Sequence, residues 1–226
     1  MSPVPNLLKP VEKGYVPLRT PLRTAALGLL ISGRGSNLQA VIEAIAAGKV
    51  RARVAVVISN RPDAQGLGRA ERAGIETLVL PHRDFATREA YDARLVDELK
   101  RRGVELVCLA GFMRLLGPTF CDAFPHAIVN VHPSLLPKFP GVDAQRQALA
   151  AGASVSGATV HFVTPDLDAG PVILQAAVPV HQTDTVATLS ARILAEEHRI
   201  LPEAIQLIAE GRCRVDGDRV IISPPS

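Results

Sequence analysis

Aromatic residues are scarce in this chain of 226 residues, which has no tryptophan, two tyrosines and six phenylalanines. A core must therefore be built from aliphatic side chains, and 47% hydrophobic residues are enough for a large one. No apolar run reaches the length of a membrane-spanning helix, and the first residues lack the compact apolar segment of a signal peptide. We therefore expect a cytoplasmic globular protein with no membrane partner.

Cysteine is also scarce. Cys108, Cys121 and Cys213 form no CxxC pair and no even-numbered framework, which favours a reducing compartment. Cys108 lies in an apolar run and is expected to be an unreactive core residue. The net charge of +3 comes without a dense run of lysine and arginine, so an anionic small molecule is a better partner than nucleic acid. No residue spacing typical of metal ligands is present, and we expect no metal.

Apolar runs alternate with amphipathic stretches through the first half of the chain. Strands are expected over 27–32, 53–59, 77–80, 106–110 and 127–132, with helices over 38–48, 65–73 and 87–102. This alternation predicts βαβ units, and hence an α/β fold with a mainly parallel, twisted sheet and helices on both faces.

The second half predicts a more varied set of elements. They are a helix over 143–150, strands over 158–164 and 172–180, a long helix over 185–211 bent at Pro202, and a strand or hairpin over 215–222. Residues 1–25 hold five prolines among mixed charges and have no periodicity, so we expect a mobile N-terminal extension. No linker follows, which makes 26–226 a single domain.

The segment Ala127–Gly141, AIVNVHPSLLPKFPG, combines a buried strand with a proline-stiffened loop. Asn130 and His132 are two residues apart, so their side chains leave an extended chain on the same face. A polar pair at the exit of an apolar strand is costly unless it faces a partner or a crevice. Because ligands bind at the carboxyl ends of strands in open α/β sheets, we expect this pair to be the reactive centre.

A glycine turn, Gly33-Arg34-Gly35-Ser36-Asn37, joins the first expected strand to a helix. Backbone N–H groups and the helix dipole at such a turn can bind an anion. The turn is not a dinucleotide fingerprint, because Leu38 occupies the place of the third glycine, and no GK[ST] follows it. The pattern alone leaves phosphate binding and a structural tight turn equally open.

Three further positions allow two interpretations each. Arg88 lies in a first helical turn, where it is either solvated or recruited to a ligand. The apolar stretch Gly111–Leu116 follows a strand and either lines a pocket or packs against Phe120. Glu197 falls within the apolar stripe of the long helix, and it either pairs with His198 or an arginine, or faces the crevice.

Four motifs in this order and spacing, SGRGSN, AGFMRLL, NVHPSLLPKFPG and DLDAGPVI, resemble those of the glycinamide ribonucleotide formyltransferase family. The resemblance extends from about Ala26 to Val220. It implies a Rossmann-like formyltransferase fold with antiparallel additions in the C-terminal half. It also implies that 26–226 is the catalytic domain, which transfers a formyl group from the co-substrate 10-formyltetrahydrofolate to the amine of glycinamide ribonucleotide in purine synthesis.

The same resemblance implies the roles of individual residues. Asn130, His132 and Asp168 match the family's catalytic trio, in which an imidazolium and an amide stabilise an oxyanion, and the carboxylate favours the charged ring. Glycinamide ribonucleotide would bind at Gly35, Ser36, Asn37 and Glu197. The folate would bind at Arg88, Met113, Arg114, Leu115 and Leu116, together with Asn130.

The chain departs from the family pattern in two places. The extension before Ala26 has no counterpart in the minimal member, and Val142-Asp143-Ala144-Gln145 replaces a segment that more often holds a histidine. His161 is either structural or an indirect contributor to the site, and we assign it no role. The protein is expected to be a monomer or a homodimer.

Rival functions would either pass the formyl group to a different acceptor or bind ligands without catalysing a reaction. A formyltetrahydrofolate deformylase would use water as the acceptor, but it usually carries an N-terminal regulatory domain, for which 25 residues are too few. A methionyl-tRNA formyltransferase usually has a longer C-terminal domain. A binding module without catalysis would not need Asn130, His132 and Asp168 together.

Overall fold

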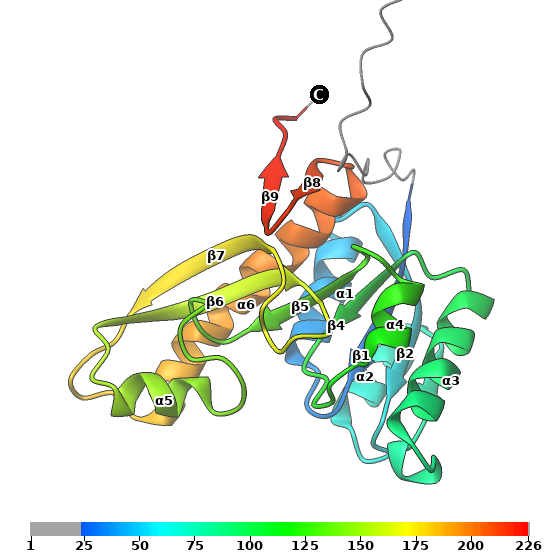
Figure 1. Ribbon diagram of the computed structural model, residues 1–226, viewed down its shortest axis with the longest axis horizontal. Coiled ribbons are helices and arrows are strands. Elements are labelled where there is room, and N and C mark those ends of the chain that lie inside the picture. Colours follow the sequence, from blue (N-terminus) through cyan, green and yellow to red (C-terminus); the bar gives the residue numbers. More distant parts are fainter. Residues whose placement is uncertain (1–23, 226) are drawn as a thin grey trace, which may run out of the picture.

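The computed structural model describes residues 24–225 (Figure 1). The predicted extension therefore lies almost wholly outside the described residues, although Ala25, its last residue, already belongs to the first strand. The strands are β1 (Ala25–Ile31), β2 (Ala52–Ser59), β3 (Thr77–Val79), β4 (Leu106–Leu109), β5 (Ile128–His132), β6 (Val155–Phe162), β7 (Val172–Pro179), β8 (Cys213–Asp216) and β9 (Arg219–Ile222). The helices are α1 (Ser36–Ala46), α2 (Gln65–Arg72), α3 (Arg88–Arg101), α4 (Pro118–Ala123), α5 (Ala144–Ala150) and α6 (Val186–Ala209), with a short 3₁₀ turn at His82–Asp84.

One sheet contains all the strands of the described residues, in the order β3-β2-β1-β4-β5-β6-β7-β9-β8. The strands from β3 to β5 are parallel, whereas β6 pairs antiparallel with both β5 and β7. The chain order reverses between β1 and β4, which makes this gap the topological switch point where α/β sheets bind ligands. The predicted fold class, a mainly parallel α/β sheet with antiparallel additions, is confirmed.

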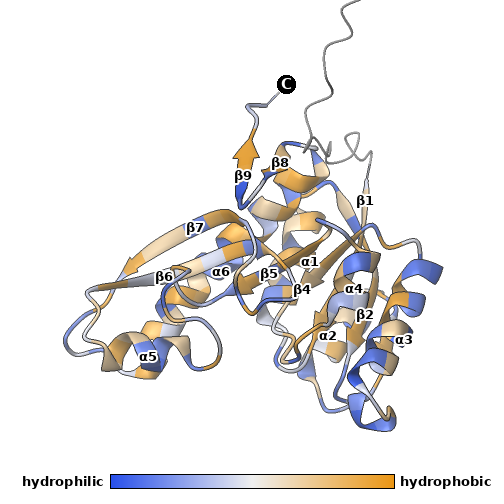
Figure 2. Cartoon of the chain, in the orientation of Figure 1, coloured by the Kyte–Doolittle hydropathy of each residue, from blue (hydrophilic) through white to orange (hydrophobic). Residues whose placement is uncertain are grey.

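The two faces of the sheet carry two separate hydrophobic clusters. On one face the cluster includes Leu38 of α1, Leu67 of α2 and Ile193 of α6. On the other face it includes Leu95 of α3 and Phe120 of α4. Figure 2 shows the strands between these layers as mainly hydrophobic and α3 as hydrophilic on much of its visible side. Because both faces are covered, the central strands read as continuous apolar runs rather than as alternating patterns.

Local sequence features set the ends of the helices. The Thr87 hydroxyl accepts a hydrogen bond from the Ala90 N–H at the start of α3, and Thr185 and Thr188 form a capping box at the start of α6. Gly48, Gly74 and Gly103 follow α1, α2 and α3 with positive φ angles of 63° to 69°, a conformation that favours glycine. These three glycines lie on the edge of the sheet where the parallel strands begin.

Several elements differ from the sequence-based expectations. β6 begins at Val155, three residues earlier than expected, and the short α4 and the 3₁₀ turn were not predicted. α6 continues through Pro202 as expected, but it ends at Ala209, two residues earlier than expected. The expected C-terminal strand or hairpin is a hairpin, β8–β9, which joins the rest of the sheet through the pair Val172–Arg219.

Candidate functional site

The antiparallel pairing of β5 with β6 places two histidines at one location. Asn130 lies opposite His161, and His132 lies opposite Thr159. His132 is 5% exposed and His161 is 2% exposed, so both imidazoles are buried at the carboxyl end of β5. The expected strand-exit pair therefore has a second imidazole beside it, supplied by the neighbouring strand.

The His132 ring lies between two oxygen acceptors. Its Nδ1 is 3.3 Å from Asp168 Oδ2, and its Nε2 is 2.9 Å from the Phe139 carbonyl oxygen. A neutral ring can donate to only one of these oxygens, whereas an imidazolium can donate to both. The surroundings thus accommodate the charged form of the ring.

Asn130 is oriented by His161. The His161 Nδ1 lies 2.9 Å from the Phe162 carbonyl oxygen, which can only accept, so Nδ1 carries the proton. Burial, the largest cause, lowers the pKa of His161 and favours the neutral ring, whose Nε2 then accepts a hydrogen bond from Asn130 Nδ2 at 3.2 Å. One proton of the Asn130 amide is used in this way, and the other remains available to a substrate.

Asp168 reaches this cluster from the turn between β6 and β7. Its φ of 50° is left-handed, a conformation that aspartate tolerates better than most residues. Two residues later, a Cβ at Gly170 would lie 1.9 Å from the Phe162 carbonyl oxygen, so only glycine fits against β6 there. Asp168 Oδ2 also accepts the Gly141 N–H at 2.8 Å, which ties the carboxylate to the loop after β5.

The loop after β5 is held by polar side chains from the antiparallel strands. Thr159 Oγ1 donates to the Ser134 carbonyl oxygen at 2.6 Å and accepts the Leu136 N–H at 3.0 Å. Gln175 Nε2 donates to the Leu136 carbonyl oxygen at 2.9 Å. These contacts hold the Ser134–Leu136 part of the Pro-rich loop, and the Phe139 carbonyl that faces His132 comes later in the same loop.

The glycine turn is shaped by α2. Gly35 is the N-cap of α1 with a φ of 70°, and no side chain caps this helix. A Cβ at Gly35 would lie 2.6 Å from Gly66 Cα, and the Gly66 N–H donates to the Gly33 carbonyl oxygen at 3.0 Å. Arg69 Nε donates to the Arg34 carbonyl oxygen at 2.9 Å. The turn is thus tightly packed, and it leaves the N-terminal end of α1 without a capping side chain.

Asn37 and Glu197 are in direct contact. Asn37 Nδ2 donates to Glu197 Oε2 at 2.7 Å and joins α1 to α6, while Asn37 Oδ1 has no hydrogen-bond partner. Burial, the largest cause, raises the pKa of Glu197. Of the two interpretations of Glu197, the structure favours the one in which it faces the crevice, because the residue lines a cavity. Its partner, Asn37, was not among the pairings expected from the sequence.

A cavity of about 600 Å³ lies at the switch point between β1 and β4. Its lining includes Gly35, Ser36, Asn37, Glu197 and Met113. The cavity therefore brings the expected nucleotide residues together with the first residue of the expected folate segment. Asn130, His132 and Asp168 are not among its lining residues.

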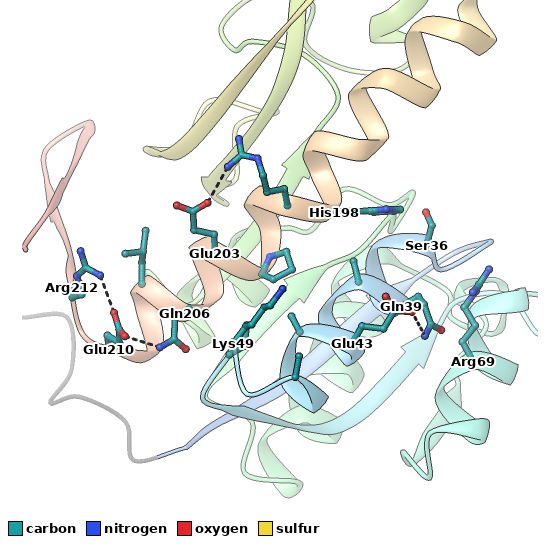
Figure 3. Close-up of a pocket in the computed structure, with 17 residues that line it drawn as sticks. Ser36, Gln39, Glu43, Lys49, Arg69, His198, Glu203, Gln206, Glu210 and Arg212 are labelled. Atoms are coloured by element: carbon teal, nitrogen blue, oxygen red, sulfur yellow. Dashed lines mark hydrogen bonds and ion pairs between the residues drawn. The ribbon is translucent and has the colours of Figure 1, made fainter. Parts of the chain in front are cut away.

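A larger groove of about 980 Å³ lies between α1 and α6, and Ser36 lines both this groove and the smaller cavity (Figure 3). Four of its charged side chains form two ion pairs, Arg199 with Glu203 and Arg212 with Glu210. Because neither Asn130, His132 nor Asp168 lines this groove, we do not assign it the chemistry.

The expected folate segment divides into exposed and buried side chains. Met113 is 72% exposed and Leu115 is 55% exposed, whereas Leu116 is 5% exposed and lies in the same hydrophobic cluster as Phe120. Arg114 lies over the Tyr91 ring, with its Cζ 5.8 Å from the ring centroid. Leu116 therefore packs against the cluster that contains Phe120, whereas Met113 and Leu115 are exposed to solvent.

Arg88 lies close to the end of this segment. A Cβ on Gly117 would be 3.6 Å from Arg88 Nε and 3.1 Å from Asp92 Oδ2, which accepts the Gly117 N–H at 2.7 Å. Burial, the largest cause, raises the pKa of Asp92. The Arg88 side chain is 44% exposed, so it is neither fully solvated nor enclosed.

Two features of residues 24–225 bear on other classes of function. Within these residues no cluster of three or more histidine, cysteine, aspartate or glutamate side chains could hold a metal ion. No helix in the described part of the chain is long and apolar enough to cross a membrane.

A sequence model of the formyl transferase family matches residues 26–205. The match covers more than half of the chain, which therefore belongs to the formyl transferase family. Phosphoribosylglycinamide formyltransferase of Escherichia coli (strain K12) is 48% identical over 187 residues, which cover 83% of this chain and 88% of the relative. A crystal structure of glycinamide ribonucleotide transformylase 1 from Symbiobacterium toebii matches with a TM-score of 0.88 and 56% identity, covering 88% of this chain and 94% of that chain. Within the formyl transferases, the chain belongs to the phosphoribosylglycinamide formyltransferases.

Some relatives are much longer. The human trifunctional purine biosynthetic protein adenosine-3 is 48% identical over 84% of this chain. This chain spans 19% of the length of the human protein and 14% of the Drosophila melanogaster protein of the same name. The similarity thus covers one part of those proteins.

Proposed function

We propose that the protein transfers the formyl group of 10-formyltetrahydrofolate to the amine of N1-(5-phospho-D-ribosyl)glycinamide, a step of de novo purine biosynthesis. The observation that carries the proposal is the contact of His132 with Asp168, beside Asn130, at the exit of β5. Two relatives that this chain covers for most of their length are named phosphoribosylglycinamide formyltransferase, which supports the acceptor and the transferred group of the proposal. Both substrates are small molecules, and neither nucleic acid nor a membrane has a role in the proposal.

His132 is the proposed general acid. Asp168 accepts from Nδ1 and stabilises a positive ring, which leaves the Nε2–H to donate to the reacting oxygen and then to the departing folate nitrogen. In this structure Nε2 faces the Phe139 carbonyl oxygen at 2.9 Å. The reacting group must therefore take the place of that carbonyl, which requires a small displacement of the loop after β5.

Asn130 is the proposed second donor to the oxyanion. Attack of the substrate amine on the formyl carbon places negative charge on the formyl oxygen. His161 fixes which end of the Asn130 amide points inward, so the free N–H is oriented before the substrate arrives. Such preorganised donors provide a large part of catalysis in acyl transfer.

The nucleotide is proposed to bind in the cavity at the switch point. The phosphate would meet the backbone of Gly35, Ser36 and Asn37 at the end of α1, which no side chain caps. Because Asn37 already donates to Glu197, its backbone N–H is a better phosphate ligand than its side chain. Glu197 would accept from the amine or the ribose.

The folate ring is proposed to lie against Met113, Arg114, Leu115 and the backbone at Leu116, with Arg88 at the outer end. The exposed apolar side chains of Met113 and Leu115 fit a flat, partly apolar ring. The proposed reaction needs no metal ion, because His132 supplies the proton and the hydrogen bond that stabilise the reacting group.

The experiment compares formyl transfer with and without glycinamide ribonucleotide. The proposal expects products to form only when the nucleotide is present. The folate product is measured by its absorbance, and the formylated nucleotide by its mass. Formate release at an equal rate without the nucleotide would instead identify a deformylase. Light scattering on the same samples would decide between the predicted monomer and homodimer.

A further inference from the structure

The loop Gly111–Gly117, which follows β4, is anchored by a side chain from another strand. Ser32 directly follows β1 and is 5% exposed. Its N–H donates to the Gly111 carbonyl oxygen at 3.0 Å, and its Oγ accepts the Met113 N–H at 2.8 Å. Ser32 thus holds two backbone groups of the loop, one through its own backbone and one through its hydroxyl.

The Ser32 hydroxyl is itself oriented. Ser32 Oγ donates to Asn60 Oδ1 at 2.7 Å, and Asn60, at the end of β2, is 5% exposed. Because a hydroxyl has one proton and that proton goes to Asn60, its lone pairs are left for the Met113 N–H. The two contacts therefore reinforce each other.

The orientation of the Asn60 amide is set by His82. Asn60 Nδ2 lies 3.3 Å from His82 Nδ1, a contact that requires Nδ1 to be unprotonated. Burial, the largest cause, lowers the pKa of His82, and the cations Arg114 and Arg83 lower it further. The neutral ring accepts from Nδ2, which leaves the Asn60 oxygen pointing at Ser32.

We propose that Ser32 and Asn60 are positioning residues for the formyl donor, because the hydroxyl that Asn60 orients fixes the Met113 amide and so the Met113–Leu116 segment. This inference rests on the proposed function of that segment. Met113 and Leu115 expose apolar side chains. Burying them against the protein surface would lower the free energy, so the loop would collapse unless its backbone were restrained. Asp92 restrains the far end through Gly117, and the Ser32–Asn60 pair restrains the near end. A preshaped loop loses less entropy when the donor binds.

The test uses Ser32→Ala, Asn60→Ala and the double variant, with Ser59→Ala as the control. Ser59 is fully buried one residue before Asn60, but its hydroxyl contacts only the Arg61 backbone. We expect Ser32→Ala to raise the KM for 10-formyltetrahydrofolate about ten-fold, as expected for one lost buried hydrogen bond. Ser32 also lines the cavity proposed for the nucleotide, but its hydroxyl is used by Asn60 and Met113, so the KM for the nucleotide should rise less than the KM for the donor. The value of kcat should change by less than about two-fold.

The double variant shows whether Asn60 acts through Ser32 or whether the two residues act independently. If Asn60 acts through Ser32, the double variant should raise the donor KM no more than Ser32→Ala alone. A multiplicative effect, or an equal rise in the donor KM for Ser59→Ala, would overturn the inference.

Amide hydrogen exchange provides a measurement that does not depend on activity. Exchange of the Met113 N–H should be slow in the wild-type protein and in Ser59→Ala, and faster in Ser32→Ala and Asn60→Ala. Unchanged protection of Met113 in Ser32→Ala overturns the positioning role even if formyl transfer is observed. Absence of transfer in the wild-type protein overturns the proposed function instead, and with it the link to a formyl donor.

Discussion

At the scale of single residues, the proposed acid–base pair makes the sharpest prediction. Replacing His132 with Asn, or Asp168 with Asn, should lower kcat about 100-fold or more, the usual range for acid–base and oxyanion groups. The His132 variant would lack the proton that the ring donates. The Asp168 variant would lack the negative charge that faces Nδ1 at 3.3 Å. Steady-state kinetics with both substrates saturating measure this effect.

A matched histidine variant serves as the control. His126 is exposed and lies before β5, so His126→Asn should leave kcat close to the wild-type value. Far-ultraviolet circular dichroism checks that each variant is folded. Near wild-type turnover in a folded His132→Asn or Asp168→Asn protein would remove that residue from the mechanism.

Gly35 makes a second residue-scale prediction, about the nucleotide. A Gly35→Val side chain would meet Gly66 Cα at 2.6 Å and would have to adopt a φ of 70°. The turn should shift, so the KM for the nucleotide should rise more than the KM for the folate, as initial rates with each substrate varied would reveal.

Gly48→Val separates backbone strain from contact in the Gly35 experiment. Gly48 also has a positive φ, of 69°, but a Cβ there has no neighbour within 4 Å. It should lower stability and leave both KM values unchanged. Equal effects of Gly35→Val on the two KM values would contradict phosphate binding at this turn.

At the scale of elements, α6 carries a buried carboxyl that links stability to pH. The pKa of Glu197 is raised above its ordinary value of 4.5, mainly by burial. The folded chain thus binds this proton more tightly than the unfolded chain does. The resulting stabilisation is complete below pH 4.5 and is lost as the pH rises through the raised pKa.

Glu197→Gln should remove this dependence. The difference in the free energy of unfolding between the variant and the wild-type protein should move in favour of the variant as the pH rises above about 4.5. Urea denaturation at a series of pH values measures it, with the exposed Glu43→Gln on α1 as the control. A pH-independent difference would mean that Glu197 is not buried as a carboxylate.

At the scale of the whole molecule, the three thiols report on global opening. Cys108 is fully buried with its pKa raised to about 12, and Cys213 is 2% exposed with its pKa raised to about 11, both mainly by burial. Thiolate is the reactive form, so these residues should react with a thiol reagent only when the structure opens. Cys121, 9% exposed, should react before the others.

Mass spectrometry of labelled peptides over time identifies which thiol reacts. All three should react within the mixing time in concentrated urea, which provides the control for accessibility. Rapid labelling of Cys108 in buffer would contradict its position in the centre of the sheet.

Patterns within the sequence were enough to predict most of the fold. The buried parallel strands are apolar runs of four to eight residues, and their bounds were predicted to within two residues. The predicted start of β6 was wrong because glycine, here Gly157, is disfavoured within strands. In the structure a Cβ at Gly157 would lie 2.0 Å from the Ala176 carbonyl oxygen, so the glycine allows close approach of β7. The helix α4 has only six residues, too few to show a repeating apolar pattern at helical spacing.

The candidate site was predictable in its residues but less so in its contacts. The polar pair at the end of β5 and the motif containing Asp168 can be found from the sequence, and the structure places them together. The partnership of Asn130 with His161 depends on an antiparallel register that no local pattern specifies. Asn37 and Glu197 are separated by 160 positions, so their contact arises only from the packing of α1 on α6. Leu116 and Leu115 are the same residue type, and only the folded loop tells the buried one from the exposed one.

Gly48, Gly74 and Gly103 end three helices on the rim where the parallel strands begin, and a Cβ on any of them would meet nothing within 4 Å. The cavity and the Asn130–His132 pair lie at the other rim, where the strands end. The glycine rim is therefore the natural place to attach the protein to a sensor chip or a resin, or to graft an affinity tag into a loop. A protein molecule tethered there would keep the cavity and the Asn130–His132 pair open to the solution.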